Sequence, residues 1–351
     1  MKYQISFKAV LGYSLVVLVM LSAQVLGQQS PSRRGWLYGD WQVKWQFKAT
    51  FGERQIEQQI ESILSFSRDR EGNQTGQLIS FWGLSELKDV KYEEGQLSFT
   101  WISRNRAGES TTSKFTGTIQ DGILSGTLSS DRGQSKLEGK RSPRIPRAVG
   151  SWQMKVKTPE REFTSTLVVK ADKEGKLTAQ WSSERGELEI TDVQYERGKL
   201  TFKMEPRQGE DRQWEAAFEG TVQRETDTLS GVIKSERGEI TAEGKRIGAA
   251  LIGIWNLELT SEQGSGKQRQ RLRVNPDMSG LYGTIPVKKV NLKDDKVSFK
   301  IVLEFGERKF EMSFEGKLKE TKLTGELTTS RGSQKVTGTK VIRTFRRGST
   351  R

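Results

Sequence analysis

The 351-residue chain contains no cysteine and no histidine. Without cysteine it can form no disulfide and offers no thiol for a lipid anchor, so an exported form must be held together by packing alone. Without either residue type it lacks the usual thiolate and imidazole ligands of zinc, copper and haem, and it cannot build a histidine-based catalytic triad. Most hydrolase mechanisms are thereby excluded, and we expect no metal and no cofactor.

Carboxylates are the acid–base groups that remain. A two-carboxylate glycosidase needs two acids in different environments inside one cleft. Glutamates such as Glu184, Glu187 and Glu196 instead fall in turns or on the polar faces of the expected strands. We therefore expect that the protein is not an enzyme.

The chain also has no long uninterrupted apolar run. Lys2 and Lys8 precede an apolar stretch over Val10–Leu21. The small residue Gly27 follows, and no acidic residue occurs in this segment. This order is typical of a secretory signal peptide, and the stretch is short of the roughly 20 apolar residues that span a bilayer. We expect residues 1–27 to be removed, with cleavage after Ala23 as the alternative, and the mature protein to be periplasmic or extracellular, with no transmembrane span.

Basic residues exceed acidic ones. Lysine and arginine total 58 against 44 acidic residues, a net charge of +14, and loss of the two signal-peptide lysines leaves +12. Such an excess favours anionic partners, among them anionic polysaccharides and lipid headgroups. Charged residues of both signs make up 29% of the chain and are interleaved, which plain solubility also explains. No feature favours a specific nucleic acid.

One pattern occurs three times. Gly-x-Trp ends at Trp41, Trp152 and Trp255, and each opens about 100 residues in which later landmarks recur in the same order. These landmarks are Leu97-Ser98-Phe99, Leu200-Thr201-Phe202 and Val297-Ser298-Phe299, then Phe-x-Gly at Phe115, Phe218 and Phe314, then Leu124, Leu229 and Leu323. Fixed-period similarity of this kind indicates tandem copies. We place them at 36–142, 148–247 and 251–342, followed by a basic tail at 343–351.

Within each copy apolar and polar residues alternate, which predicts half-buried strands. Turn signals recur about every 10 to 12 residues, the spacing of an antiparallel meander. The middle copy shows eight strands, which begin near Trp152, Thr166, Leu177, Ile190, Leu200, Ala216, Leu229 and Ile240. A meander of eight strands loses its free edges by closing on itself. The predicted fold is all-β: three tandem eight-stranded antiparallel up-and-down barrels after an N-terminal signal helix.

A Gly-x-Trp on the first strand and a cation on the last strand resemble the lipocalin and avidin group of calycin barrels. The copies also resemble tandem small barrels of exported bacterial proteins. The resemblance implies that the tryptophan closes one end of each barrel and that a cation packs over its ring. The implied pairs are Trp41 with Arg141, Trp152 with Arg246, and Trp255 with Lys340. Copies of about 100 residues lack the long loops that wall off a lipocalin ligand, so the resemblance does not extend to a deep pocket.

The first copy carries extra aromatic residues at expected interior positions, namely Trp45, Phe47 and Trp101. These side chains could line a pocket for an apolar or sugar ligand. The alternative, which we favour, is that they simply form a bulkier core.

The third copy carries four cations with period two: Lys267, Arg269, Arg271 and Arg273. Leu272 belongs to the inward-facing set, so the cations point away from the barrel interior. Such a row could follow an acidic polymer through phosphate, sulfate or carboxylate contacts. The alternative is an ordinary solvated barrel wall.

Together these patterns predict an exported, non-enzymatic binding or structural protein of the bacterial cell envelope. Its partner would be an anionic glycan, a lipid headgroup or an envelope protein, bound through barrel surfaces. The alternative is a carrier that holds a small apolar ligand in the aromatic interior of the first barrel.

Overall fold

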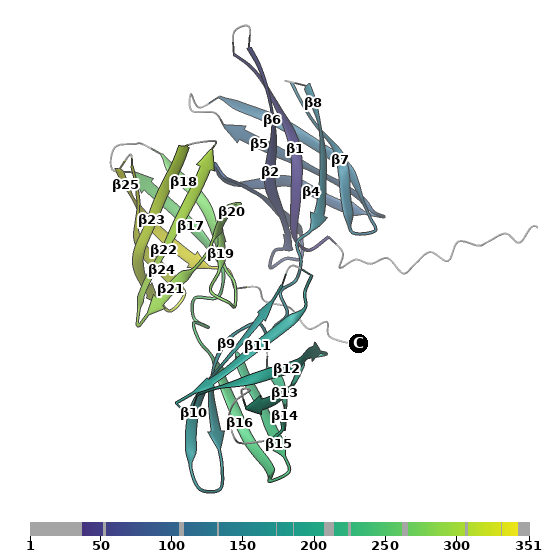
Figure 1. Cartoon of the computed structure of the whole chain (residues 1–351). Helices are drawn as coiled ribbons and strands as arrows, with labels where there is room; N and C mark the ends of the chain where they lie inside the picture. Colours follow the sequence, from purple (N-terminus) through teal and green to yellow (C-terminus); the bar gives the residue numbers. More distant parts are fainter. Residues whose placement is uncertain are drawn as a thin grey trace, which may run out of the picture. The chain divides into compact units, whose positions relative to one another are not determined.

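The computed structural model describes residues 37–342 except 52–53, 105–108, 132, 173, 185, 207–213, 224–225, 262–265, 306–307 and 331. The predicted signal peptide and basic tail lie outside these residues. The described part contains strands and no helix, and it folds as three antiparallel up-and-down barrels of eight, eight and nine strands (Figure 1). The predicted fold class is confirmed, apart from the signal helix, which the described residues do not include.

The first barrel closes by hydrogen bonding between its first and last strands, from Trp41 paired with Arg141 to Trp45 paired with Leu137. Its strands are β1 (Gly39–Phe51), β2 (Arg54–Arg68), β3 (Gln74–Ser80), β4 (Gly83–Glu93), β5 (Gln96–Arg104), β6 (Ser110–Gln120), β7 (Ile123–Ser130) and β8 (Gly133–Arg141).

The second barrel closes in the same way, and each of its eight predicted strand starts lies inside an observed strand. Its strands are β9 (Gly150–Lys157), β10 (Glu162–Ala171), β11 (Leu177–Ser183), β12 (Gly186–Glu196), β13 (Lys199–Pro206), β14 (Ala216–Gln223), β15 (Thr228–Ser235) and β16 (Gly238–Arg246).

The third barrel has nine strands because one strand is divided. In the first two barrels the fourth strand is continuous and bulged, with positive φ angles at Asp89 and Asp192. The counterpart in the third barrel is broken at residues 288–289 into two short strands, β20 and β21. These two strands form the two ends of the hydrogen-bonded sheet and are not paired with each other. The strands are β17 (Gly253–Ser261), β18 (Lys267–Val274), β19 (Gly280–Tyr282), β20 (Ile285–Val287), β21 (Val290–Lys293), β22 (Lys296–Phe305), β23 (Arg308–Lys319), β24 (Lys322–Thr329) and β25 (Gly332–Lys340).

The recurring Phe-x-Gly motif packs a phenylalanine across two facing glycines. In the second barrel Phe218 stacks on Phe202 with ring centroids 4.8 Å apart, and its ring end lies over Gly220 and Gly231. A Cβ at Gly231 would sit 2.4 Å from the carbonyl oxygen of Glu219, so no larger residue fits there. The repeated glycines therefore make room for the core rings.

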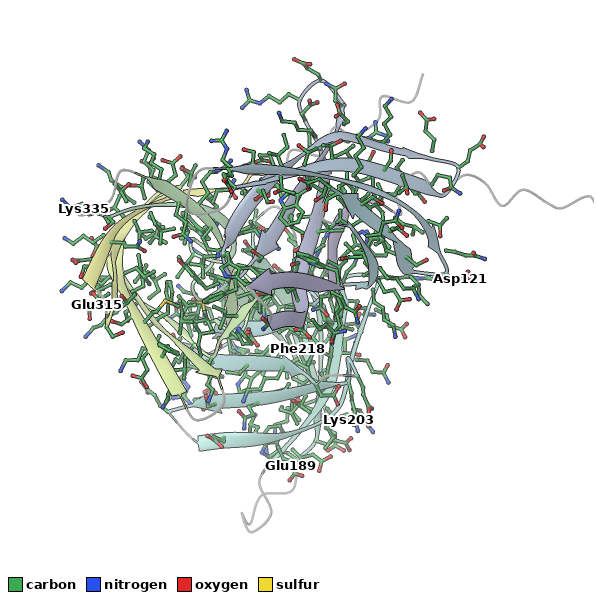
Figure 2. All side chains as sticks on the ribbon, turned by 90° about the horizontal axis from the view of Figure 1, so that it is seen from above. Asp121, Glu189, Lys203, Phe218, Glu315 and Lys335 are labelled. Carbon is green, nitrogen blue, oxygen red and sulfur yellow. The ribbon has the colours of Figure 1, made fainter. Side chains whose placement is uncertain are left out.

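Side-chain direction follows the alternation in the sequence. Phe218 is buried in the second barrel, whereas Glu315 and Lys335 project away from the third barrel (Figure 2). Each sheet thus buries one face and leaves the other to solvent.

Candidate functional site

A recurring tryptophan is buried near the start of the first strand of each barrel. Trp41, Trp152 and Trp255 are completely buried. Each indole Nε1 donates a hydrogen bond to the backbone carbonyl four residues earlier, at 2.8 Å to Leu37, 2.9 Å to Ala148 and 2.8 Å to Leu251. A buried indole N–H needs such a partner.

A cation from the last strand lies over each of these rings. The distance from the cation to the ring centroid is 5.9 Å for Arg141, 3.9 Å for Arg246 and 5.7 Å for Lys340. The same cations also cap backbone carbonyls before the first strand: Arg141 donates to Tyr38, Arg246 donates to Arg147 at 2.6 Å, and Lys340 donates to Ala250 at 2.7 Å. Their arrangement thus ties the last strand to the segment that enters the first.

Sequence reasoning missed these carbonyl acceptors. The signal was present, because an apolar residue stands four positions before each tryptophan, at Leu37, Ala148 and Leu251. The closed ends therefore have a complete structural explanation in packing and hydrogen bonding.

The aromatic interior of the first barrel is nearly filled. Trp45 and Trp101 meet edge to face with centroids 5.6 Å apart, and Trp45 Nε1 donates to Ser62 Oγ at 3.3 Å. The side chain of Phe47, which we also predicted here, lies outside the part that the structure describes. The free space beside the two indoles is about 10 Å³, with Leu64, Phe99 and other apolar side chains around it. That volume corresponds to about one water molecule, whereas small-molecule pockets measure roughly 300–1,000 Å³.

The structure places the cation row of β18 against the first barrel. Arg271 is 2% exposed and forms a two-pronged ion pair with Asp40 of β1, at 3.2 and 3.0 Å. Arg273 approaches the same carboxylate at 3.6 Å. Arg269 pairs with Glu86 of β4 at 2.9 Å. The row does point away from its own barrel. Part of it contacts the first barrel and does not face solvent.

Lys267, the fourth cation, pairs with Glu258 of its own barrel at 3.6 Å. Every member of the row therefore has a carboxylate partner among the described residues. Arg271 is buried and cannot reach an external polymer, so the row as predicted is not an open anion-binding surface.

A shortened hairpin explains why the first barrel fits against β18. Six residues separate Leu78 from its strand partner Ser85 in the first copy, whereas two separate Tyr282 from Ile285 in the third. The short β19 pairs with only the last three residues of β18 and leaves the earlier part of that edge uncovered. The β3–β4 turn of the first barrel lies there.

Two glutamines of β18 bind the backbone of this turn. Gln268 Nε2 donates to the carbonyl of Trp82 at 2.8 Å, and Gln270 Nε2 donates to the carbonyls of Ser80 and Phe81 at 3.1 and 3.3 Å. Gly83 follows with φ of 145°, and a Cβ there would lie 2.9 Å from a backbone oxygen of β18. The equivalent Gly186 has open space around it. This glycine is thus needed for the close approach in the first copy.

The carboxylate of Asp40 is the electrostatic centre of this contact. Burial raises the pKa of Asp40, but the charge of Arg271, a 2.7 Å hydrogen bond from Ser65 and the charge of Arg273 lower it by more. The net result is a pKa below the ordinary value of 3.8. Asp40 is therefore ionised at neutral pH and binds Arg271 as a carboxylate.

This shift predicts a pH dependence of stability. Because the folded pKa lies below the unfolded one, the contribution of Asp40 is present above about pH 4 and is lost as pH falls through the folded pKa. We expect Asp40→Asn to be clearly less stable than wild type at pH 7, and the difference to shrink as the pH falls below about 4. Urea unfolding of both proteins at pH 7 and below pH 4 measures the difference in stability. A difference that stays constant with pH would contradict the prediction.

The described residues hold no group of three or more acidic side chains placed to bind a metal ion, and none of their segments forms a helix able to cross a bilayer. No protein-family model and no curated protein sequence matches the chain.

Several solved structures share a partial likeness. A proposed outer membrane protein from Bacteroides fragilis is 12% identical over 59% of this chain and 96% of its own, with a TM-score of 0.22. Transferrin binding protein B is 10% identical over 87% of this chain in both Haemophilus parasuis (76% of that chain, TM-score 0.22) and Neisseria meningitidis (77%, TM-score 0.18). These scores support no conclusion about function, and the resemblance to lipocalins and avidins stays a prediction.

Proposed function

We propose that the protein is a non-enzymatic binding or structural protein of the bacterial cell envelope that acts through the outer surfaces of its barrels. The observation that carries the proposal is the filled interior. Trp152, Phe202 and Phe218 occupy the second barrel, and Trp255, Phe299 and Phe314 occupy the third. The first retains about 10 Å³ beside Trp45 and Trp101.

Two further observations support a surface role. The chain carries a net charge of +14, which attracts anionic envelope components over long range. The barrels are also in direct contact, since Asp40 and Arg271 join the first to the third. This contact restricts the motion of the first barrel against the third, which lowers the entropic cost of binding a partner that touches both.

Salt dependence separates this proposal from the carrier alternative. We expect the mature protein to bind dextran sulfate or phosphatidylglycerol vesicles and to lose about tenfold or more in affinity between 50 and 300 mM salt. We expect no saturable uptake of an apolar dye such as 1-aminoanthracene. Fluorescence titration and co-sedimentation give both quantities.

The opposite result would favour the carrier. The surface role would be refuted if the protein bound neither anionic probe but took up one dye molecule per chain. This uptake would be insensitive to salt and would be lost in Trp45→Ala. Trp181→Ala, which removes a buried indole from the second barrel, is the matched control for this variant.

A further inference from the structure

The β3–β4 turn of the first barrel exposes two aromatic side chains. Trp82 is 59% exposed and Phe81 is 36% exposed, with their rings edge to face at 6.0 Å. At the corresponding place in the sequence the second copy has Glu184 and Arg185, and in the third copy the turn is shortened to Gly283-Thr284. The aromatic residues that pack the barrel interiors, such as Phe115 and Trp181, are buried, whereas this pair lies exposed at a turn. Packing of the barrel therefore does not explain it.

The backbone of this turn is already hydrogen-bonded by protein groups. Gln268 and Gln270 occupy the carbonyls of Ser80, Phe81 and Trp82, and the Trp82 amide donates to Ser80 Oγ at 3.2 Å. These contacts hold the turn in one conformation. They also allow it to enter an apolar environment without leaving those carbonyl groups unsatisfied.

Charge lies next to the aromatic pair. Lys267 and Arg269, on either side of Gln268, have side chains 73% and 42% exposed. Each has one acidic partner, so the local charge is balanced, and attraction to an anionic surface comes from the net charge of the whole chain.

We propose that the Phe81–Trp82 turn is an interfacial anchor that inserts its two rings into the surface of an anionic lipid bilayer. This inference rests on the proposed function and names its partner as a lipid surface. Tryptophan and phenylalanine favour the boundary between headgroups and acyl chains, because the ring is apolar while the indole N–H still reaches water. Basic charge brings the chain to the surface, and the rings hold it there without spanning the bilayer.

Co-sedimentation with vesicles tests the anchor. The vesicles are phosphatidylglycerol and phosphatidylcholine at equal amounts, with pure phosphatidylcholine as the neutral surface. We expect Trp82→Ala to weaken binding to the anionic vesicles by about tenfold and Trp82→Phe to restore most of it. Trp214→Ala, which removes an indole that is 37% exposed in the second barrel, is the matched control and is expected to bind like wild type.

A second measurement locates the indole. Brominated phosphatidylglycerol quenches tryptophan that enters the acyl boundary, so we expect stronger quenching in wild type than in Trp82→Phe. Unchanged binding and unchanged quenching in the Trp82 variants would overturn the anchor.

Failure of the anchor and failure of the proposed function give different results. If wild type bound dextran sulfate but neither vesicle, the anchor would be refuted while the surface role stood. If it bound neither vesicles nor dextran sulfate and took up the apolar dye, both would be refuted. Circular dichroism of each variant shows that a loss of binding is not a loss of fold.

Discussion

Replacing Arg271 with alanine is expected to lower the free energy of unfolding by about 3–5 kcal/mol. The substitution leaves the carboxylate of Asp40, 8% exposed, buried between two barrels without its main counter-charge. Much of the loss is the desolvation of that unpaired charge and not the attraction of the pair itself. Urea unfolding at pH 7 measures the change.

Two further variants decide the cause. Arg269→Ala removes a partly exposed cation from the same strand and is expected to cost at most about 1 kcal/mol. Asp40→Ala combined with Arg271→Ala removes both buried charges and is expected to be more stable than Arg271→Ala alone. Equal effects of the two arginine substitutions would show that Arg271 is not buried against Asp40.

Replacing Trp152 with alanine is expected to cost about 3–5 kcal/mol, because it empties the closed end of the second barrel and leaves Arg246 without the ring beneath it. Trp152→Phe keeps an aromatic ring but loses the hydrogen bond to the carbonyl of Ala148, so its effect should be smaller. Thermal or urea unfolding gives both values. Trp214→Ala, on the exposed surface, serves as the control and should change stability by no more than about 0.5 kcal/mol.

A small effect of Trp152→Ala would contradict the view that the recurring tryptophans hold the barrels closed. It would instead favour a ligand-stacking role for these rings, although they are buried and hydrogen-bonded within the chain.

The barrel fold was predictable because its causes are local and repeated three times. Alternation of apolar residues defines which face of each strand is buried, and regular turn signals define a meander. Gly-x-Trp and Phe-x-Gly recur at fixed positions, so each copy supports the interpretation of the others. The split strand at residues 288–289 was not predictable, because the same break in apolar alternation occurs in the continuous strands of the other copies: two polar residues separate Val287 from Val290, as they separate Leu87 from Val90 and Ile190 from Val193.

The contact between the first and third barrels could not be derived from periodicity. Asp40 and Arg271 lie 231 residues apart, and alternation shows which way Arg271 points from its own barrel but not what stands opposite it. Two signals indicate the contact. The residue between glycine and tryptophan is acidic only in the first copy, and Ser151 and Ile254 stand at this position in the second and third copies. The β19–β20 hairpin is shortened only in the third copy.

Arg269, Arg271 and Arg273 of β18 bind the first barrel, which leaves the other surfaces of the chain for a partner. The absence of cysteine allows a direct test, because two introduced cysteines are the only thiols. Glu86→Cys with Arg269→Cys places them where the native side chains meet at 2.9 Å. A short bismaleimide is predicted to link this pair within one chain, and to leave the control pair Glu86→Cys with Lys199→Cys unlinked. If the first pair linked no better than the control, the arginines of β18 would not bind the first barrel, and the two barrels would not be in contact.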